Sequence, residues 1–176
     1  MSNKYTIGID IGLHGGMTLM REDKKILECV AIPTIEVLVG KKVRNQYDIH
    51  SINSIIDRWN VPGEQIKAGM ERLRAIPNQS SMTAFSMGGG TMLFKTLFTV
   101  HKISFIEIEP RSWQQKIFKN LGIQYNKDTT KKASIQAARQ LWPSERFLAT
   151  PRSRVPSDGM TDASCIALYT KINDEL

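Results

Sequence analysis

Short apolar runs separated by turn residues dominate the first thirty positions of the chain. The runs are rich in Ile, Leu, Met and Val, and glycines or charged residues lie between them. This pattern predicts an antiparallel meander of three strands. The predicted strands cover residues 4–11, 16–20 and 26–32. The next segment, residues 33–47, has no clear period, and its Pro33 and Gly40 favour a loop or a ragged hairpin.

The rest of the chain alternates between helical and strand patterns. Asp48 precedes a run whose isoleucines and Trp59 fall on one helical face, and its carboxylate suits an N-cap. Asp128 is expected to cap a later helix, and Pro110 suits the first turn of another. Two further strands are predicted at residues 66–71 and 103–108. The predicted helices cover residues 49–59, about 79–101 after a turn at Pro77-Asn78, a stretch from Pro110, 129–141 and 158–173.

This order of elements predicts an α/β fold in which a mixed sheet is flanked by helices. The length of 176 residues fits one domain, so the predicted domain spans residues 1–176. No stretch approaches the roughly 20 apolar residues that span a bilayer, and the first residues lack the apolar core of a signal peptide. We therefore expect a cytoplasmic protein. Cys29 and Cys165 are far apart in apolar surroundings, which predicts reduced core residues.

Positive charge is concentrated in one part of the chain. The formal net charge is +7, and the segment from Arg111 to Arg154 contains ten Lys or Arg but only two acids, Asp128 and Glu145. Solvated helix faces would explain such a segment, and so would a surface that follows a phosphate backbone. We favour the second interpretation. Within this segment, residues 143–157 carry several prolines and arginines and predict a mobile basic loop.

Four carboxylates lie in settings that indicate a shared site. Asp10 and Glu71 each end a buried run, where an unpaired charge is costly. Asp158 and Asp162 are spaced i, i+4, so both leave one face of a helix and repel each other unless a cation lies between them. Carboxylate oxygens are the ligands that Mg²⁺ prefers, and two such ions can promote attack on a phosphodiester.

Each of these acids also has a simpler explanation. Asp10 suits a turn at the end of a strand, and Asp158 suits a helix cap with Asp162 solvated nearby. Glu71 has two potential partners in Arg72 and Arg74. The joint pattern, rather than any one residue, therefore supports a metal site.

The sequence resembles the RuvC-like Holliday junction resolvases, especially their phage and poxvirus branch. The resemblance spans nearly the whole chain, and its segments occur in the order that the family has. They are Ile7-Gly8-Ile9-Asp10-Ile11-Gly12, Ala68-Gly69-Met70-Glu71, Glu109-Pro110-Arg111-Ser112-Trp113, Lys131-Lys132-Ala133-Ser134 and Asp158-Gly159-Met160-Thr161-Asp162-Ala163.

The resemblance implies a ribonuclease H-like fold with a mixed five-stranded sheet flanked by helices. It also implies a homodimer that nicks two strands of a four-way DNA junction, in recombination or phage DNA processing, within a bacterial or phage-infected cytoplasm. The implied metal ligands are Asp10, Glu71, Asp158 and Asp162, which would hold two Mg²⁺ ions or, as a substitute, Mn²⁺. Lys131 or Lys132 would contact phosphate near the scissile bond, and Lys132 is counted with the catalytic residues. The expected DNA contacts are Arg72, Arg74, Arg111, Lys116, Lys131, Lys132, Arg152 and Arg154.

Two departures separate this chain from the bacterial members. The last two acids are four residues apart, as in the phage and poxvirus relatives, rather than three. The bacterial proteins carry an aromatic wedge after the glutamate, where this chain has Arg72-Leu73-Arg74. We therefore expect the protein to prefer branched DNA while showing little preference for base sequence. The expected substrates include other branched junctions besides four-way junctions.

Two other functions fit parts of the sequence. An ATP-using protein of the actin and sugar-kinase type also has Ile-Asp-Ile-Gly on its first strand, but it needs two lobes. A junction-binding scaffold without catalysis would gain nothing from acids facing phosphates. Gly88-Gly89-Gly90 indicates a bend or a close backbone approach rather than a phosphate loop, because no Gly-Lys-Ser/Thr follows. His14, in the turn after Asp10, and Glu107, on a strand, are further candidates to lie near the metals.

Overall fold

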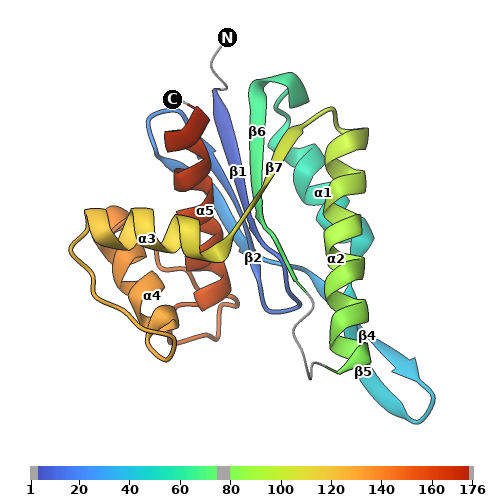
Figure 1. Ribbon diagram of the computed structural model, residues 1–176. Helices are drawn as coiled ribbons and strands as arrows, with labels where there is room; N and C mark the ends of the chain where they lie inside the picture. Colours follow the sequence, from blue (N-terminus) through green and yellow to red (C-terminus); the bar gives the residue numbers. More distant parts are fainter. Residues whose placement is uncertain (1–3, 75–79, 175–176) are drawn as a thin grey trace.

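A five-stranded mixed sheet forms the centre of the fold in the computed structural model, which describes residues 4–74 and 80–174 (Figure 1). The strand order is β3-β2-β1-β6-β7. β1 pairs antiparallel with β2 and parallel with β6, and β7 lies parallel beyond β6. The strands are β1 Tyr5–Asp10, β2 Gly16–Arg21, β3 Ile26–Ala31, β6 Ile66–Glu71 and β7 Ser104–Ile108. The predicted meander and the mixed five-stranded sheet are confirmed.

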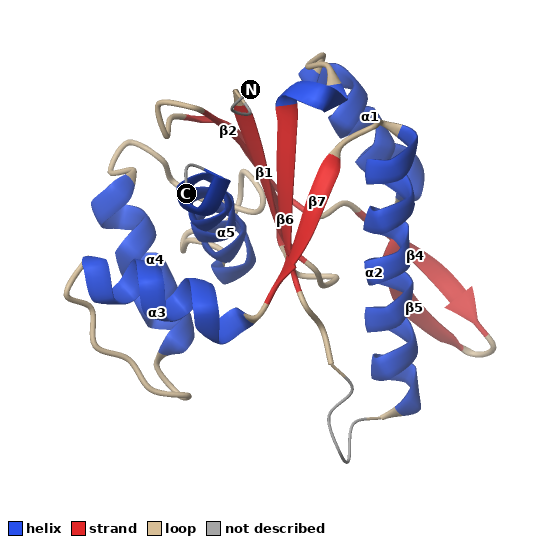
Figure 2. Cartoon of the chain, turned by 45° about the horizontal axis from the view of Figure 1, so that its top comes forward, coloured by secondary structure: helices blue, strands red, loops and turns tan. Residues whose placement is uncertain are grey.

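Helices cover both faces of this sheet (Figure 2). α1 and α2 pack on one face, where Ile7 and Ile9 of β1 meet Phe94 and Phe98 of α2. α3, α4 and α5 pack on the other, around the buried Trp113. Alternate residues of a strand point to opposite faces, so the apolar β1 supplies both layers. The helices are α1 Ile49–Trp59, α2 Ser81–Val100, α3 Pro110–Asn120, α4 Thr130–Leu141 and α5 Asp158–Asp174, with a 3₁₀ turn at Gly63–Gln65.

α5 lies directly against β1 because glycine leaves room for its backbone. A Cβ added to Gly8 would come within 2.0 Å of the carbonyl oxygen of Ala163 in α5. Small residues continue along the helix, and most of α5 is buried on all sides. This close packing carries the acids of α5 to the central strand of the sheet.

The segment after β3 is more regular than the sequence predicts. Residues 33–47 form a β-hairpin, with β4 Thr34–Val39 and β5 Lys42–Tyr47 paired antiparallel in a sheet of their own. The alternative of a loop is therefore wrong and the hairpin is confirmed. Its sequence shows no hydrophobic alternation because most of its side chains are exposed on both faces.

Two details of the helices test the predictions. One continuous helix, α2, runs through Gly88-Gly89-Gly90, and of the two predicted alternatives the close approach is confirmed at Gly90, where an added Cβ would lie 2.4 Å from the Tyr47 hydroxyl. Asp128 does not cap α4. The N-cap position belongs to Thr129, and Asn126 Oδ1 accepts hydrogen bonds from the backbone N–H groups of Asp128 and Thr129 instead.

Of the remaining predictions, some are tested by the structure and two concern residues that it does not describe. The predicted cap at Asp48 is confirmed, since its carboxylate accepts a hydrogen bond from the Ser51 backbone N–H at 3.1 Å. Residues 143–157 contain neither helix nor strand. The predicted turn at Pro77-Asn78 and the first residue of the predicted second helix lie outside the described residues. Within the described ranges, no helix has the length and hydrophobicity of a membrane span.

Candidate active site

Asp10 and Glu71 lie side by side at one edge of the sheet. They end β1 and β6, which are parallel neighbours whose register places Ile9 opposite Met70. The residues that follow this pair are Asp10 and Glu71. Because parallel strands end at the same edge, the two carboxylates meet there.

The start of α5 reaches the same edge. Gly15 and Gly159 form an isolated parallel bridge, and Gly16 pairs with Asp10 in the β1–β2 ladder. A Cβ added to Gly159 would come within 2.3 Å of the His14 carbonyl oxygen, so only glycine allows this approach. Asp158 therefore lies beside the end of β1, and Asp162 follows one helical turn later on the same face.

Asp10 is the most perturbed of the four acids. Burial raises the pKa of its carboxyl well above the usual 3.8, and the negative charges of Glu71, Asp162 and Asp158 raise the pKa further. Lys131 acts in the opposite direction. Each of the other three acids is thus near enough to repel Asp10 through the protein, which places all four in one cluster.

Asp162 is partly buried, and one of its oxygen atoms is fully buried and unsatisfied. Its Oδ1 has no hydrogen-bond partner among the residues that the structure describes, and the nearby Ser134 hydroxyl donates to Thr161 Oγ1 at 2.9 Å. Burial, with repulsion from Glu71 and Asp158, raises the pKa of Asp162 to about 7, although Ser134 moderates the shift. A buried carboxylate oxygen without a donor costs free energy unless a proton or a cation satisfies it.

Glu71 is held by an indole rather than by an arginine. Trp113 Nε1 of α3 donates to Glu71 Oε1 at 2.7 Å. Burial raises the pKa of Glu71, and this hydrogen bond partly offsets the rise. The expected alternative, a pair with Arg72 or Arg74, is wrong, because both arginines form ion pairs with Glu109 at 3.5 and 2.5 Å.

Asp158 is paired with a cation. Lys131 Nζ, at the start of α4, lies 2.6 Å from Asp158 Oδ2. Burial acts to raise the pKa of Asp158, but the Lys131 ammonium and backbone N–H groups outweigh it and lower the pKa. Asp158 is the first residue of α5 and not a cap. The solvated position suggested for Asp162 is also wrong, because that side chain is partly buried and its Oδ1 is shielded from solvent.

The chemistry of this cluster suits a hard divalent cation. In the described part of the chain, no three His, Cys, Asp or Glu side chains are arranged to hold a metal as they stand. The cluster nevertheless offers only carboxylate oxygens, and one of them, Asp162 Oδ1, is buried without a partner among the described residues. The ammonium of Lys131 already places one positive charge beside Asp158. Such a set fits Mg²⁺ once Lys131 and the side chains shift.

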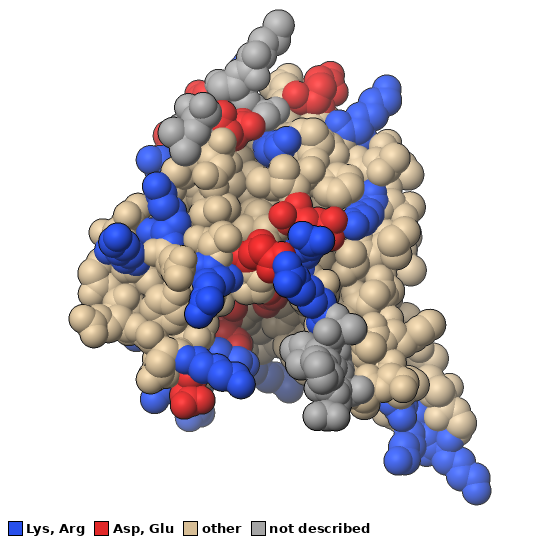
Figure 3. Space-filling model, in the orientation of Figure 1, with Lys and Arg blue, Asp and Glu red and all other residues tan. Residues whose placement is uncertain are grey.

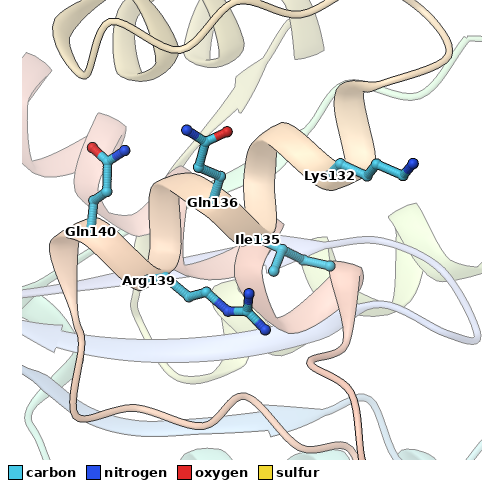
Figure 4. Close-up of a pocket in the computed structure, with 5 residues that line it drawn as sticks. All are labelled: Lys132, Ile135, Gln136, Arg139 and Gln140. Atoms are coloured by element: carbon cyan, nitrogen blue, oxygen red, sulfur yellow. The ribbon is translucent and has the colours of Figure 1, made fainter.

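The other predicted contact residues lie at the surface. Arg111, Lys116, Lys131, Lys132, Arg152 and Arg154 are all exposed. Lys132 lines a surface pocket along α4 with Arg139 and Ile135 (Figure 4). In Figure 3, Lys and Arg side chains surround acidic ones near the middle of this face.

The two further candidates for the metal site have other surroundings. His14 is exposed in the turn between β1 and β2. Glu107 is partly exposed on β7 and bonded to Lys95 Nζ at 2.8 Å. Of the cysteines, Cys165 is buried and Cys29 partly buried, and both are free, as predicted.

Comparison with known proteins identifies the fold. No protein-family model matches the sequence, and none of the curated proteins matches it. Solved structures do match. RuvC from Thermus thermophilus in complex with a Holliday junction substrate has a TM-score of 0.56 and 14% identity, over 93% of this chain and 90% of that one. The chain has the ribonuclease H-like fold of RuvC.

Two further structures agree. Thermus thermophilus RuvC in a second structure has a TM-score of 0.51 and 13% identity, with 97% of both chains covered. The yeast mitochondrial Holliday junction resolvase has a TM-score of 0.53 and 15% identity, over 99% of this chain and 80% of that one. At these identities the likeness extends to the RuvC-like fold, which confirms the predicted fold class.

Three features of the site were not predicted from the sequence. Trp113 is buried in the core, and its indole N–H also orients Glu71. Lys131 was expected on phosphate, but it contacts Asp158. Tyr47 lies close enough for the charge of Asp10, after burial, to raise its pKa. Trp113 and Lys131 had a sequence signal, their places in the segments Glu109-Pro110-Arg111-Ser112-Trp113 and Lys131-Lys132-Ala133-Ser134, whereas Tyr47 had none.

Proposed function

We propose that this protein is a Mg²⁺-dependent, structure-selective endonuclease that resolves four-way and other branched DNA junctions by paired nicking, as a member of the phage and poxvirus branch of the RuvC-like resolvases. The observation that supports this most directly is the cluster of Asp10, Glu71, Asp158 and Asp162 at the carboxyl edge of a RuvC-like sheet. Three of these acids, Asp10, Glu71 and Asp162, have raised pKa values, which means that their charged forms are destabilised in the fold, and a cation site explains why they are present.

The four carboxylates would hold two Mg²⁺ ions, with Mn²⁺ as a substitute. Bound ions would supply an activated water for attack on phosphorus and charge to stabilise the departing 3′ oxygen. Trp113 fixes the orientation of Glu71, which spares that carboxylate from reorganising when a ligand binds. The ends produced would be a 5′-phosphate and a 3′-hydroxyl, which can be ligated.

Lys131 has a second role in this proposal. Its ammonium contacts Asp158 while its side chain is 81% exposed, so it can leave the acid without unpacking the core. With a cation held by Asp158, the Lys131 ammonium would be free to contact the scissile phosphate. Lys132 follows it on the exposed side of α4 and would contact the backbone nearby.

The proposed substrate is branched DNA. The basic segment from Arg111 to Arg154 provides phosphate contacts around the cluster, including Arg111, Lys116, Arg152 and Arg154. Arg72 and Arg74 add charge next to Glu71. The Thermus thermophilus RuvC structure contains a Holliday junction substrate, and a similar DNA is inferred for this protein.

Paired nicking requires two active sites, so we infer a homodimer. α2 exposes Met82, Phe85 and Met92, with Phe85 80% accessible. Added Cβ atoms at Gly88 and Gly89 would meet nothing within 4 Å, so this apolar side of α2 is open, and Met82, Phe85 and Gly89 line a surface pocket between α2 and the β4–β5 hairpin. A second α2 can approach such a surface closely, which would bury these side chains.

Cleavage of a synthetic four-way junction tests the proposal. The wild type with Mg²⁺ should nick opposing strands at symmetric positions, and EDTA or Asp10→Asn should abolish cleavage. Glu107→Gln is the matched control, because it removes a partly exposed carboxylate that is bonded to Lys95 outside the cluster. The proposal is wrong if the wild type leaves the junction uncut, or if Asp10→Asn cuts it as well as the control does. Binding without cleavage would favour the catalytically silent scaffold.

A further inference from the structure

The β4–β5 hairpin projects from the body of the molecule beside α2 (Figure 1). Its strands pair only with each other, from Thr34 opposite Tyr47 to Val39 opposite Lys42. Gly40 and Lys41 form the turn, in which Gly40 takes a φ of 64°. A two-stranded hairpin has little stability by itself. A hairpin that projects from the body therefore adds little to the stability of the fold, and a role in binding would explain its presence.

The outer half of this hairpin is strongly basic. Lys41, Lys42 and Arg44 are exposed, and Glu36 is the one acid of the hairpin. None of the three basic side chains forms an ion pair with another residue that the structure describes. Figure 3 shows these charges as a separate basic group at the lower right of the molecule.

The inner half of the hairpin is anchored at the proposed active site. Ile32, just before β4, donates its backbone N–H to the Gly15 carbonyl oxygen at 3.1 Å, in the turn that follows Asp10. At the other end, a Cβ on Gly90 would lie within 3 Å of both the Tyr47 hydroxyl and Ile11 Cγ2. Both strands of the hairpin therefore begin or end beside the carboxylate cluster.

The dimensions of the hairpin match those of duplex DNA. From Tyr47 to Lys42 the strand extends five residues, or about 16 Å at roughly 3.3 Å per residue. Along one DNA strand the charges are about 3.4 Å apart per nucleotide, so this length corresponds to about five base pairs. A two-stranded β-ribbon also fits the major groove, which is about 12 Å wide.

We propose that the β4–β5 hairpin is a DNA-binding arm that contacts phosphates about five base pairs from the cleaved bond, through Lys41, Lys42 and Arg44. This inference rests on the proposed nuclease function and adds a second contact surface on the side opposite the 111–154 segment. The exposed Leu38 and Val43 form one cross-strand pair, and Ile35 and Val39 are exposed as well, with Val39 beside a pocket against α2. The three cations at the outer half have no ion-pair partner among the described residues, and this unbalanced positive charge favours an anionic partner there.

A charge-matched pair of triple variants tests this arm. The hairpin variant is Lys41→Gln/Lys42→Gln/Arg44→Gln, and the control is Lys24→Gln/Lys25→Gln/Lys102→Gln. The control residues are exposed and lie in turns at the opposite edge of the sheet, after β2 and before β7. Both variants lose three positive charges, so any difference between them reports position rather than net charge.

Junction affinity is measured against salt concentration in EDTA. Each lost phosphate contact should reduce the slope of log affinity against log salt by about 0.9, so the hairpin variant should lose up to about 3 units and the control almost none. Hydroxyl-radical protection about five base pairs from the cut should disappear only in the hairpin variant. At saturating protein, its single-turnover cleavage should stay within about twofold of the wild type, because the acids are untouched.

Equal slopes and footprints for the two variants would overturn the DNA arm. So would a change of oligomeric state in the hairpin variant with an unchanged slope, since that outcome assigns the hairpin to a protein contact. The single variant Lys42→Gln, with one lost contact, gives the same comparison should the triple variant fold poorly. A wild type that binds junctions through the arm without cutting them would refute the nuclease proposal and leave the arm intact.

Discussion

Asp162→Asn should stabilise the metal-free protein at alkaline pH. The substitution keeps the shape of the side chain but removes an ionisable group whose Oδ1 is buried without a partner. Burial raises the pKa of Asp162 from 3.8 to about 7. Between these two values the folded state binds a proton that the unfolded state has released, so the free energy of unfolding falls as pH rises through that range.

The expected effect is large for a single side chain. A rise of about three pKa units, at roughly 1.36 kcal/mol each, corresponds to about 4 kcal/mol lost between pH 4 and pH 8. For a protein of this size, each kcal/mol changes Tm by about 2–4 °C. The Asp162→Asn variant should lack most of this pH dependence and melt well above the wild type at pH 8. Near pH 4, where the wild-type carboxyl is protonated, the two proteins should melt alike.

Thermal and urea unfolding in EDTA at pH 5, 6, 7 and 8 measure this directly, with Glu107→Gln as the control for losing a carboxylate elsewhere. Adding Mg²⁺ at pH 8 should raise the Tm of the wild type, because a bound cation replaces the missing proton, and should raise that of Asp162→Asn much less. A variant that keeps the wild-type pH dependence, or that is less stable at pH 8, would refute the assignment of Asp162 as a strained buried acid.

Three other substitutions probe the surroundings of the cluster. Trp113→Phe removes the donor to Glu71 while keeping an aromatic ring, so the Mg²⁺ concentration for half-maximal cleavage should rise about 10- to 100-fold with junction affinity unchanged. Lys131→Gln removes the cation beside Asp158, and the single-turnover cleavage rate should fall about 100-fold, whereas the Kd for the junction should change little. Gly8→Ala places a Cβ 2.0 Å from a backbone oxygen of α5, and the free energy of unfolding from urea titration should fall by at least about 3 kcal/mol. A wild-type value in any of these measurements would contradict the contact on which that prediction depends.

The strands and the acids could be predicted because their signals are local. Apolar runs in β1 and β6 specify buried strands wherever they lie in the chain, and Asp48 can cap α1 from its own sequence neighbourhood. A carboxylate at the end of each buried strand predicts convergence, since parallel neighbours end at one edge. The resemblance to RuvC-like resolvases added the order of the segments and thereby the correct fold class.

The hairpin and α4 show where local signals fail. The hairpin side chains are exposed on both faces, so no burial pattern marks its strands. Asp128 has a side chain that can cap a helix, but Asn126 Oδ1 accepts the hydrogen bonds from the backbone N–H groups of Asp128 and Thr129. A competing short-range contact therefore decided the start of α4, whereas backbone pairing between two exposed strands decided the hairpin.

By itself, the amino-acid sequence determined which segments become buried strands, where the basic charge lies and which acids end the strands. The tertiary structure decided the partners: Trp113 for Glu71, Lys131 for Asp158 and, within the described ranges, none for Asp162 Oδ1. Trp113 and Glu71 are 42 positions apart in the chain, and Lys131 and Asp158 are 27 apart. Both contacts depend on how closely α5 packs on β1 and on where α3 and α4 pack beside α5. Burial and charge repulsion act between such neighbours, so the pKa values that make the cluster a candidate site arise only in the folded chain.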